Sequence, residues 1–120
     1  IGRDEISSVS KEIDYEKVCE DLRSLGVKVV ELTLGENGSI VTGEEIHRIP
    51  AYKTTLVDKT GSGDVFATAF AIKYFESKNE LESGLFASAA ASFVVEDFGT
   101  NNIQSREKVE ERFRLLKNNK

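Results

Sequence analysis

Apolar residues recur at every third or fourth position between Asp14 and Gly26, a spacing that predicts an amphipathic helix. Asp14 is a typical N-cap residue, and Gly26 suits the position that follows a helix C-terminus. β-branched and alternating residues then predict three strands, at residues 27–34, 39–42 and 46–49. Glycine-containing turns separate these strands, and Pro50 ends the last, which therefore reads as an edge strand. Strand character returns at residues 54–57.

From Gly63 onward the hydrophobic period becomes that of a helix. The pattern predicts one helix around residues 63–74, a second around residues 81–93 and a third, amphipathic one over residues 105–117. Small side chains permit close packing, so the alanines of the first two helices indicate that both are buried. These alanines are Ala67, Ala69, Ala71, Ala87, Ala89, Ala90 and Ala91. The alternation of helices and strands, without repeats or an obvious linker, indicates a single α/β unit over residues 1–120.

Composition narrows the class of protein. The 120 residues are 39% hydrophobic and 31% charged, which is ordinary for one soluble globular domain, and no run of apolar residues is long enough to cross a membrane. A formal net charge of −5 offers no basic surface for nucleic acid. The single cysteine, Cys19, cannot form an internal disulfide, which favours a cytoplasmic protein with Cys19 in a packing role. Because the chain lacks methionine and begins at Ile1, we expect a piece of a longer protein.

The histidine, the acidic pairs and the aromatic residues do not indicate a functional site. His47 is the only histidine, which excludes a Ser/His/Asp triad or a histidine metal cluster within the chain, and its strand position predicts an exposed side chain. The acidic pairs at residues 44–45, 96–97 and 110–111 diverge and are interpreted as solvated charge. The phenylalanines and tyrosines have core-like spacing, so we expect them to pack inside the protein.

The most informative segment is Asp58-Lys59-Thr60-Gly61-Ser62-Gly63-Asp64. Gly61 and Gly63 permit a turn whose consecutive N–H groups point at one anion, and the helix that follows adds its positive end. The same helix end favours the ionised form of Asp64, which can then take a proton from a bound hydroxyl. An anion cradle beside a base suits phosphoryl transfer to an alcohol. The alternative, that Ser62 and Asp64 only cap a helix, remains open at this point.

Two motifs carry a family resemblance. The segment has neither the P-loop pattern nor the third glycine of the dinucleotide fingerprint. Residues 58–64 instead resemble the Asp-x-Thr-Gly-Ala/Ser-Gly-Asp signature of the ribokinase family, also called PfkB-type carbohydrate kinases, and Thr33-Leu34-Gly35-Glu36-Asn37-Gly38 is similar to that family's Thr-Leu-Gly-x-x-Gly. The order of elements agrees, so the resemblance covers nearly the whole chain. It implies an α/β fold, a ribokinase-like three-layer α-β-α sandwich, of which this chain is the C-terminal half only.

The resemblance also implies roles for individual residues. Asp64 would be the general base that activates the acceptor hydroxyl. The N–H groups of Gly61, Ser62 and Gly63 would form the anion hole for the transferred phosphoryl group.

A second set of residues would bind the nucleotide. Thr33, Gly35 and Gly38 would lie along its phosphates and ribose, although a plain hairpin turn explains the two glycines equally well. Ser88 occupies the position where many relatives place an asparagine near the adenine.

For metals, the resemblance implies two positions. Glu5 matches the acid of the family's Asn-x-x-Glu motif, which is linked to Mg²⁺, although the asparagine is missing and an exposed acid at a helix start is an alternative. In relatives that use a monovalent cation such as K⁺, oxygen ligands come from the loop near Asp58 and Thr60 and from the segment corresponding to residues 94–99.

Together these features predict an ATP-dependent kinase acting on a hydroxyl of a sugar or nucleoside, with Mg²⁺ as cofactor. This piece would hold the nucleotide site and the base, while acceptor specificity would lie in a missing N-terminal half or another chain, so that the piece alone is inactive. Exposed sheet edge or apolar surface would favour a homo-oligomer. The alternative is a non-catalytic domain that binds a nucleotide or phosphate for regulation or assembly.

Overall fold

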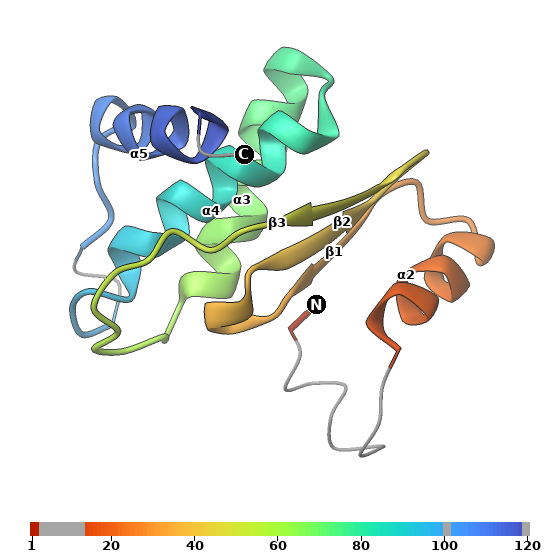
Figure 1. Ribbon diagram of the computed structural model, residues 1–120, viewed down its shortest axis with the longest axis horizontal. Coiled ribbons are helices and arrows are strands. Elements are labelled where there is room, and N and C mark those ends of the chain that lie inside the picture. Colours follow the sequence, from red (N-terminus) through yellow and green to blue (C-terminus); the bar gives the residue numbers. More distant parts are fainter. Residues whose placement is uncertain (3–13, 100–101, 119–120) are drawn as a thin grey trace.

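The computed structural model describes residues 1–2, 14–99 and 102–118 (Figure 1). The helices and strands within this part are α2 (Tyr15–Ser24), β1 (Val30–Thr33), the 3₁₀ turn η1 (Gly35–Asn37), β2 (Ser39–Thr42), β3 (Ile46–Ile49), α3 (Ser62–Ser77), α4 (Glu80–Val94) and α5 (Arg106–Asn118). No described helix is both long and apolar enough to cross a membrane.

The three strands form one antiparallel sheet in the order β1-β2-β3. Thr42 pairs with Val30 on one side and with Ile46 on the other. Ile1 and Gly2 run beside β1 in the parallel direction, and the Thr33 N–H donates to the Ile1 carbonyl at 2.8 Å. β1 and β3 point the same way because each is antiparallel to β2. The turn after β1 and the loop after β3 therefore leave the sheet at the same end.

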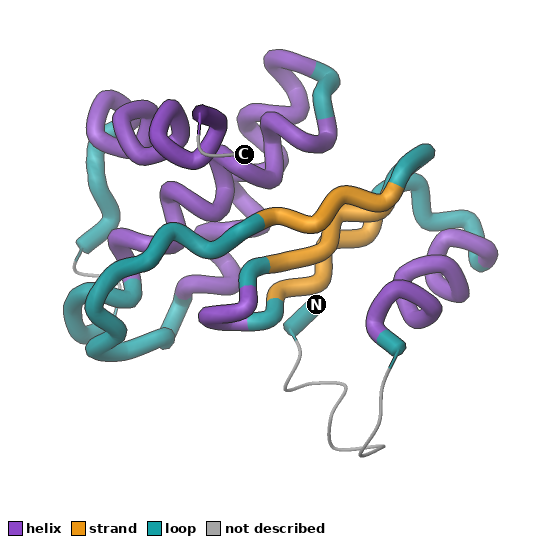
Figure 2. The backbone as a smooth tube through the Cα atoms, in the orientation of Figure 1, coloured by secondary structure: helices purple, strands orange, loops and turns teal. Residues whose placement is uncertain are grey.

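Helices cover both faces of the sheet, which gives the expected three layers (Figure 2). α2 packs on one face and buries Cys19 completely against β1 and β2, as expected for a packing cysteine. Asp14 caps α2 through a hydrogen bond from the Lys17 N–H, as predicted. On the other face α4 packs against β2 and β3, and its Gly84 lies so close that an added Cβ would be 2.8 Å from the Ile49 side chain.

α3 and α5 pack on α4 rather than on the described strands. Phe113 of α5 meets Phe86 of α4 edge-on, with ring centroids 5.9 Å apart. Arg106 of α5 donates two hydrogen bonds of 2.5 Å to Glu76 of α3. α5 is thereby fastened across the other two helices, and the core on this side is formed largely by helix–helix contacts.

The prediction that α3 is buried was wrong for half of its surface. α3 buries Phe66, Ala69 and Phe70 against α4, but Ala67 and Ala71 on the opposite side are exposed. Further along this exposed face, Ile72 and Phe75 are 47% and 79% exposed. Alanine content indicates that a helix can pack closely, but it does not say whether a partner covers every side.

Three other expectations need correction. Residues 54–57 form no strand, because the N–H of Val57 donates at 2.7 Å to the carbonyl of Val95 rather than to a neighbouring strand. The first strand begins at Val30, three residues later than predicted, because residues 27–29 make no ladder pairing. Phe98, like Phe75, is exposed rather than packed inside.

Two polar residues expected to be solvated are partly buried instead. The side chain of His47 is only 18% exposed because it lies 3.7 Å from the carboxylate of Glu80 at the start of α4. Glu96 accepts hydrogen bonds from Thr54 and Arg112. In both cases the partner side chain comes from a distant element, which the local pattern does not show.

Glu31 supports a prediction about the pH dependence of stability. Its strand partner Val41 belongs to the core beneath α4, so Glu31 points to the same face, and one of its carboxylate oxygens is buried without a hydrogen-bond partner. Burial raises the pKa of Glu31 to about 7, against the lowering effect of the Ile1 ammonium group. Between its ordinary pKa and this value, the unfolded chain releases a proton that the folded chain keeps, so stability falls as the pH rises.

Glu31→Gln should therefore stabilise the chain by about 1–3 kcal/mol at pH 8 and by close to nothing at pH 4. Urea unfolding at both pH values measures the difference. Glu20→Gln, at an exposed position of α2, is the control and should change neither value. An equal gain in stability from Glu31→Gln at both pH values would show that folding does not raise the pKa of Glu31.

Candidate functional site

The predicted signature turn, residues 58–64, lies at the N-terminus of α3. The Ser62 N–H donates to the Lys59 carbonyl at 3.1 Å, which closes a tight turn immediately before the helix. Gly61 has φ 82° and ψ −6°, the values that a type II turn requires at its third residue and that side chains with a Cβ rarely adopt. The glycine at this position is thus a requirement of the turn.

The N–H groups of Gly61, Ser62 and Gly63 were predicted to face an anion, and the structure differs from this at Ser62. The Ser62 N–H is engaged within the turn, whereas no acceptor for the N–H groups of Gly61, Gly63 and Asp64 is found in the described part of the chain. A Cβ added to Gly63 would meet nothing within 4 Å, so the space beside it is open. The helix N-terminus therefore offers unpaired donors to an anion from solvent.

The helix-cap alternative does not describe this turn. The Ser62 hydroxyl donates to the Lys59 carbonyl at 2.8 Å, and the N-cap of α3 is Gly61, which has no side chain to offer. Asp64 is exposed, and within residues 1–2, 14–99 and 102–118 no donor reaches its carboxylate. Asp64 is thus at the mouth of the turn with its oxygens available.

Asp58 fastens the start of the signature turn. Its carboxylate accepts hydrogen bonds from the Gly99 N–H at 2.9 Å and from the Thr60 N–H and hydroxyl at 3.0 and 2.7 Å. These bonds, that from Gly99 first, lower the pKa of Asp58. The Asp58 N–H also donates to the Val95 carbonyl at 3.1 Å. The structure therefore brings together the two segments predicted to supply cation ligands, but it occupies the Asp58 oxygens with protein donors.

The predicted nucleotide-binding glycines lie in the tight turn between β1 and β2, residues 34–38. The Leu34 N–H donates to the Gly38 carbonyl at 2.8 Å, and the Gly38 N–H to the Gly35 carbonyl at 3.1 Å. Gly35 and Gly38 have φ of 62° and 87°. A Cβ at Gly38 would lie 2.1 Å from the carbonyl oxygen of Ile49, so this glycine allows the turn to press against the end of β3. Thr33 precedes the turn, and its hydroxyl donates to the Ile1 carbonyl at 3.4 Å.

Comparison with known proteins decides the family. Residues 3–107 match the sequence model of a family described as pfkB family carbohydrate kinase. This chain belongs to the PfkB family. Among curated PfkB relatives, a nucleoside kinase from Methanothermobacter thermautotrophicus is 42% identical over 79 residues, which are 66% of this chain and 26% of that protein. A ribokinase from Arabidopsis thaliana is 44% identical over 77 residues, 60% of this chain and 20% of that protein.

Solved structures of PfkB relatives align with most of this chain. A ribokinase from Thermotoga maritima aligns with a TM-score of 0.83 and 36% identity over 94% of this chain and 40% of its own. The Arabidopsis thaliana ribokinase complexed with ribose and ATP aligns with a TM-score of 0.74 and 30% identity over 82% of this chain and 33% of its own. The fold class is therefore confirmed: the chain is a part of the ribokinase-like sandwich, and it spans less than half the length of these relatives.

Two further predicted site residues are Ser88, which the structure describes, and Glu5, which it does not. Ser88 is 8% exposed, and its hydroxyl donates to the Pro50 carbonyl at 2.8 Å, which anchors the beginning of the β3–α3 loop, residues 50–61. Its predicted contact with adenine stays a prediction. Glu5 lies outside the described residues. Within the described part, no group of three or more histidine, cysteine and acidic side chains is placed to hold a metal ion.

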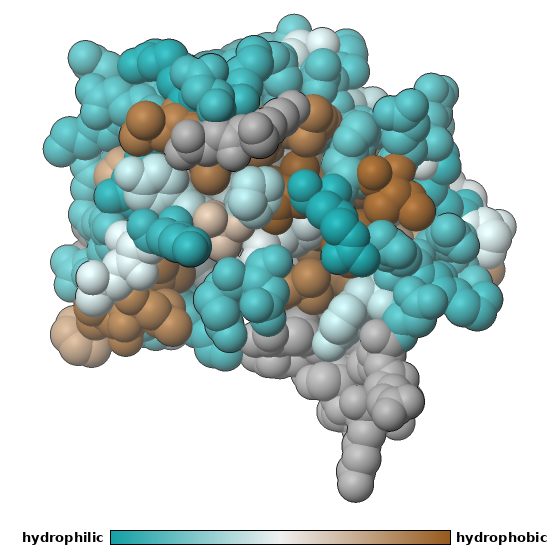
Figure 3. Space-filling model, viewed as in Figure 1, coloured by the Kyte–Doolittle hydropathy of each residue, from teal (hydrophilic) through white to brown (hydrophobic). Residues whose placement is uncertain are grey.

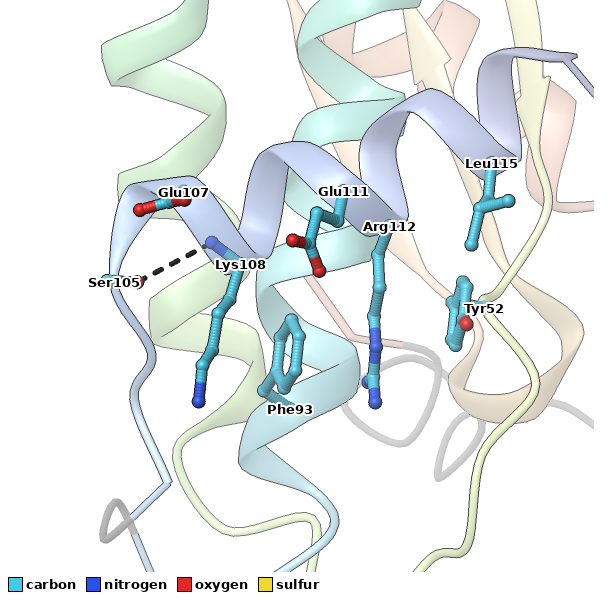
Figure 4. A pocket seen from close by; sticks show the side chains of 8 residues that line it. All are labelled: Tyr52, Phe93, Ser105, Glu107, Lys108, Glu111, Arg112 and Leu115. Carbon is cyan, nitrogen blue, oxygen red and sulfur yellow. Dashed lines mark hydrogen bonds between the residues drawn. The ribbon is translucent and has the colours of Figure 1, made fainter.

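The structure also brings together a group of residues that no local sequence pattern indicates. A cavity of about 400 Å³ lies between Tyr52 of the β3–α3 loop, Phe93 of α4 and Arg112 of α5 (Figure 4). Arg112 stands within a run of charged residues on an amphipathic helix, so nothing in the local pattern distinguishes it from a solvated side chain. Only the fold reveals that it reaches the loop leading to the signature turn.

Proposed function

We propose that this chain is the C-terminal, nucleotide-binding part of an ATP-dependent kinase that phosphorylates a hydroxyl group of a sugar or nucleoside. The observation that carries the proposal is the turn at the start of α3. There Gly61 adopts a left-handed conformation, three N–H donors have no acceptor among the described residues, and Asp64 is exposed. The printed names of the relatives, nucleoside kinase and ribokinase, support the two acceptor classes. The buried free Cys19 agrees with a reducing, cytoplasmic setting.

The turn suits an anionic group because its unpaired donors and the helix dipole act at one point. The N–H groups of Gly61, Gly63 and Asp64 would face the oxygens of the migrating phosphoryl group and stabilise the negative charge on them. Asp64 would accept the proton of the attacking hydroxyl, so that the oxygen becomes a stronger nucleophile as it approaches. The Ser62 N–H stays within the turn and maintains its shape.

ATP is the proposed phosphoryl donor, and the turn at residues 34–38 and Ser88 are its proposed further contacts. Mg²⁺, when bound to the nucleotide, neutralises charge on its phosphates. Among the described residues, no three histidine, cysteine or acidic side chains meet at a metal position. Glu5 is the proposed contact toward Mg²⁺. Because the Asp58 oxygens accept from protein donors, a cation such as K⁺ would take its oxygen ligands from the two segments that the Asp58 carboxylate joins, near residues 58–60 and 94–99.

The exposed face of α3 supports the view that a further part of the protein, or another chain, completes the site. Ala67, Ala71, Ile72 and Phe75 follow Asp64 at helical intervals along this face, and all four are exposed. A partner that covers this stripe would also lie beside Asp64, where the acceptor hydroxyl must bind. Without that partner, we expect the stripe to promote association between copies of the chain.

The test combines binding and transfer. The 120-residue chain is titrated with ATP, and the full-length protein that contains it is assayed on a panel of sugars and nucleosides. The proposal expects nucleotide binding by the chain and phosphorylation of at least one acceptor by the longer protein. Binding without transfer to any acceptor would favour the non-catalytic nucleotide-binding domain.

Gly63→Ala tests the proposed anion cradle directly. Because Gly63 has helical φ and open space around it, alanine should leave the free energy of unfolding within about 0.5 kcal/mol of the original. Its methyl group would stand beside the donors, so ATP affinity should fall by about tenfold. Calorimetric titration and urea unfolding of the same samples measure both. Unchanged affinity would contradict the placement of phosphate at this turn.

A further inference from the structure

Arg112 of α5 is held on two sides by aromatic rings. Its guanidinium carbon lies 3.6 Å from the centroid of the Phe93 ring in α4 and 4.5 Å from that of Tyr52 in the β3–α3 loop. Figure 4 shows its side chain extending from α5 between these two rings. Its side chain is only 18% exposed, so these contacts are partly shielded from water. The rings and the cation therefore join α5 directly to the loop that leads to the signature turn.

The same guanidinium reaches the loop by a second route, through Glu96. Nη2 of Arg112 donates to the Glu96 carboxylate at 3.0 and 3.3 Å, and Nη1 donates to the buried hydroxyl of Ser92 at 2.9 Å. Glu96 in turn accepts a hydrogen bond from the hydroxyl of Thr54, which lies in the loop two residues after Tyr52. Burial opposes ionisation of Glu96, but the bonds from Thr54 and Arg112 outweigh it and lower its pKa.

The β3–α3 loop contains no helix or strand of its own, so its position depends on contacts with other elements. Ser88 anchors its beginning through Pro50, and the anchors nearer the signature turn come from the same segment of the chain as Glu96. The N–H groups of Val57 and Asp58 both donate to the carbonyl of Val95, and the Asp58 carboxylate accepts from the N–H of Gly99. Glu96 lies between these two anchors, so whatever fixes Glu96 also fixes the surface on which the loop rests.

We propose that Arg112 is a positioning residue for phosphoryl transfer: by holding Tyr52 and Glu96 together, it sets the place of the β3–α3 loop and thereby of the Gly61–Asp64 turn. The role rests on the proposed function. It is indirect, because Arg112 contacts the loop several residues before the turn. A loosened loop would misplace the donors and the Asp64 carboxylate relative to the acceptor.

This role predicts a separation of kinetic effects that a merely stabilising contact would not produce. The turn at residues 34–38, which is proposed to bind the nucleotide, receives none of the Arg112 contacts found in the described part of the chain. Loss of Arg112 should therefore lower kcat by more than it raises the KM for ATP, because the turn at residues 34–38 still contacts the nucleotide. A general loss of stability would instead reduce the amount of active enzyme. It would raise amide exchange throughout the protein rather than in this loop alone.

Lys117→Met provides a matched control. Lys117 is another cation of α5, which pairs with Glu82 of α4 and whose Nζ lies 5.7 Å from the Phe113 ring. None of its interactions found in the described part of the chain involves the β3–α3 loop. Arg112→Met and Lys117→Met thus each remove one cation that has a carboxylate and an aromatic partner. The two variants differ in their partner residues. Tyr52 lies in the β3–α3 loop and Glu96 is bonded to it through Thr54, whereas Glu82 and Phe113 lie in α4 and α5.

The experiment uses the full-length protein that contains this chain. Arg112→Met should lower kcat by about tenfold or more and raise the KM for ATP by clearly less than that, by about threefold at most, and Lys117→Met should change neither. Hydrogen exchange provides a readout independent of activity: the amides of Val57 and Asp58 should exchange about tenfold faster in Arg112→Met only. Arg112→Lys, which keeps the charge but loses the planar stacking and paired donors, should restore less than half of the lost kcat.

The outcomes separate the two proposals. Equal kcat values and equal exchange rates for the Arg112→Met and Lys117→Met variants would overturn the positioning role. If the wild-type enzyme transfers no phosphate, the proposed function fails, while the exchange rates still decide whether Arg112 fixes the loop. If Arg112→Met does not fold, Arg112→Lys replaces it, with the same split of kcat from KM and the same local rise in exchange required.

Discussion

Asp64→Asn in the full-length protein is expected to lower the rate of phosphoryl transfer by about 10²–10⁴-fold, the usual contribution of a general base. Asparagine has nearly the same shape but cannot accept a proton from the attacking hydroxyl. The affinity for ATP should stay equal or increase, because the change removes a negative charge beside the donors that face the phosphates. Single-turnover assays measure the transfer rate, and equilibrium titration measures the binding.

Asp21→Asn is a suitable control because Asp21 is an exposed acid on α2 whose carboxylate forms a long ion pair of 3.5 Å with Lys17. It should leave both quantities unchanged. Unaltered turnover in Asp64→Asn would show that Asp64 is not the general base, even if the chain binds nucleotide. Loss of binding together with turnover would instead assign Asp64 to the nucleotide site.

The parts of the fold that depend on local pattern could be predicted from the sequence. The strands at residues 39–42 and 46–49 have the predicted bounds, because alternation and the adjacent turn residues determine them without help from distant parts. The N-cap at Asp14 and the left-handed Gly26 are likewise local features. The three-layer arrangement was implied by the family resemblance, whereas the order of elements indicated only a single α/β unit.

The errors arose where a distant partner decides the structure. The β-branched segment 54–57 has strand propensity, but the N–H of Val57 finds its acceptor in the carbonyl of Val95, 38 residues later and just after α4. His47 has the pattern of an exposed strand residue, yet the start of α4 brings Glu80 against it. Local propensity cannot anticipate contacts of this kind, which depend on how the elements come together.

The candidate site divides in the same way. The turn at Gly61 and Gly63 follows from the steric freedom of glycine and the start of a helix, both of which a sequence displays. That the Ser62 N–H closes the turn instead of facing an anion is a detail of backbone geometry that residue types alone do not determine. Arg112 and Glu96 have surface-like patterns, and their meeting across two elements depends on the packing of α5.

The largest effect on stability is expected from Gly38→Ala. The Cβ would lie 2.1 Å from the Ile49 carbonyl oxygen and 3.2 Å from the Ala51 nitrogen, and both are backbone atoms that no rotamer change can move aside. Gly38 also has φ 87° and ψ −142°, a conformation that is strained for any residue with a Cβ. We therefore expect a loss of about 3 kcal/mol or more, measured by urea unfolding of the chain.

Gly26→Ala separates the two causes of this loss. Gly26 has φ 105°, but an added Cβ would meet nothing within 4 Å, so only backbone strain of about 1–2 kcal/mol applies there. The excess cost of Gly38→Ala over Gly26→Ala then measures the close contact between the β1–β2 turn and the end of β3. If the two variants lose equal stability, that contact is looser than the structure indicates.

The contact at Gly38 also has a consequence for the site. Ile49 and Ala51 flank the start of the β3–α3 loop, whose far end is the signature turn, so relief of the clash must move either the nucleotide-binding turn or the loop. Gly38→Ala should for this reason weaken ATP binding as well as stability, whereas Gly26→Ala, at the other end of β1, should weaken stability alone. Titration with ATP under conditions where both variants are folded distinguishes these effects.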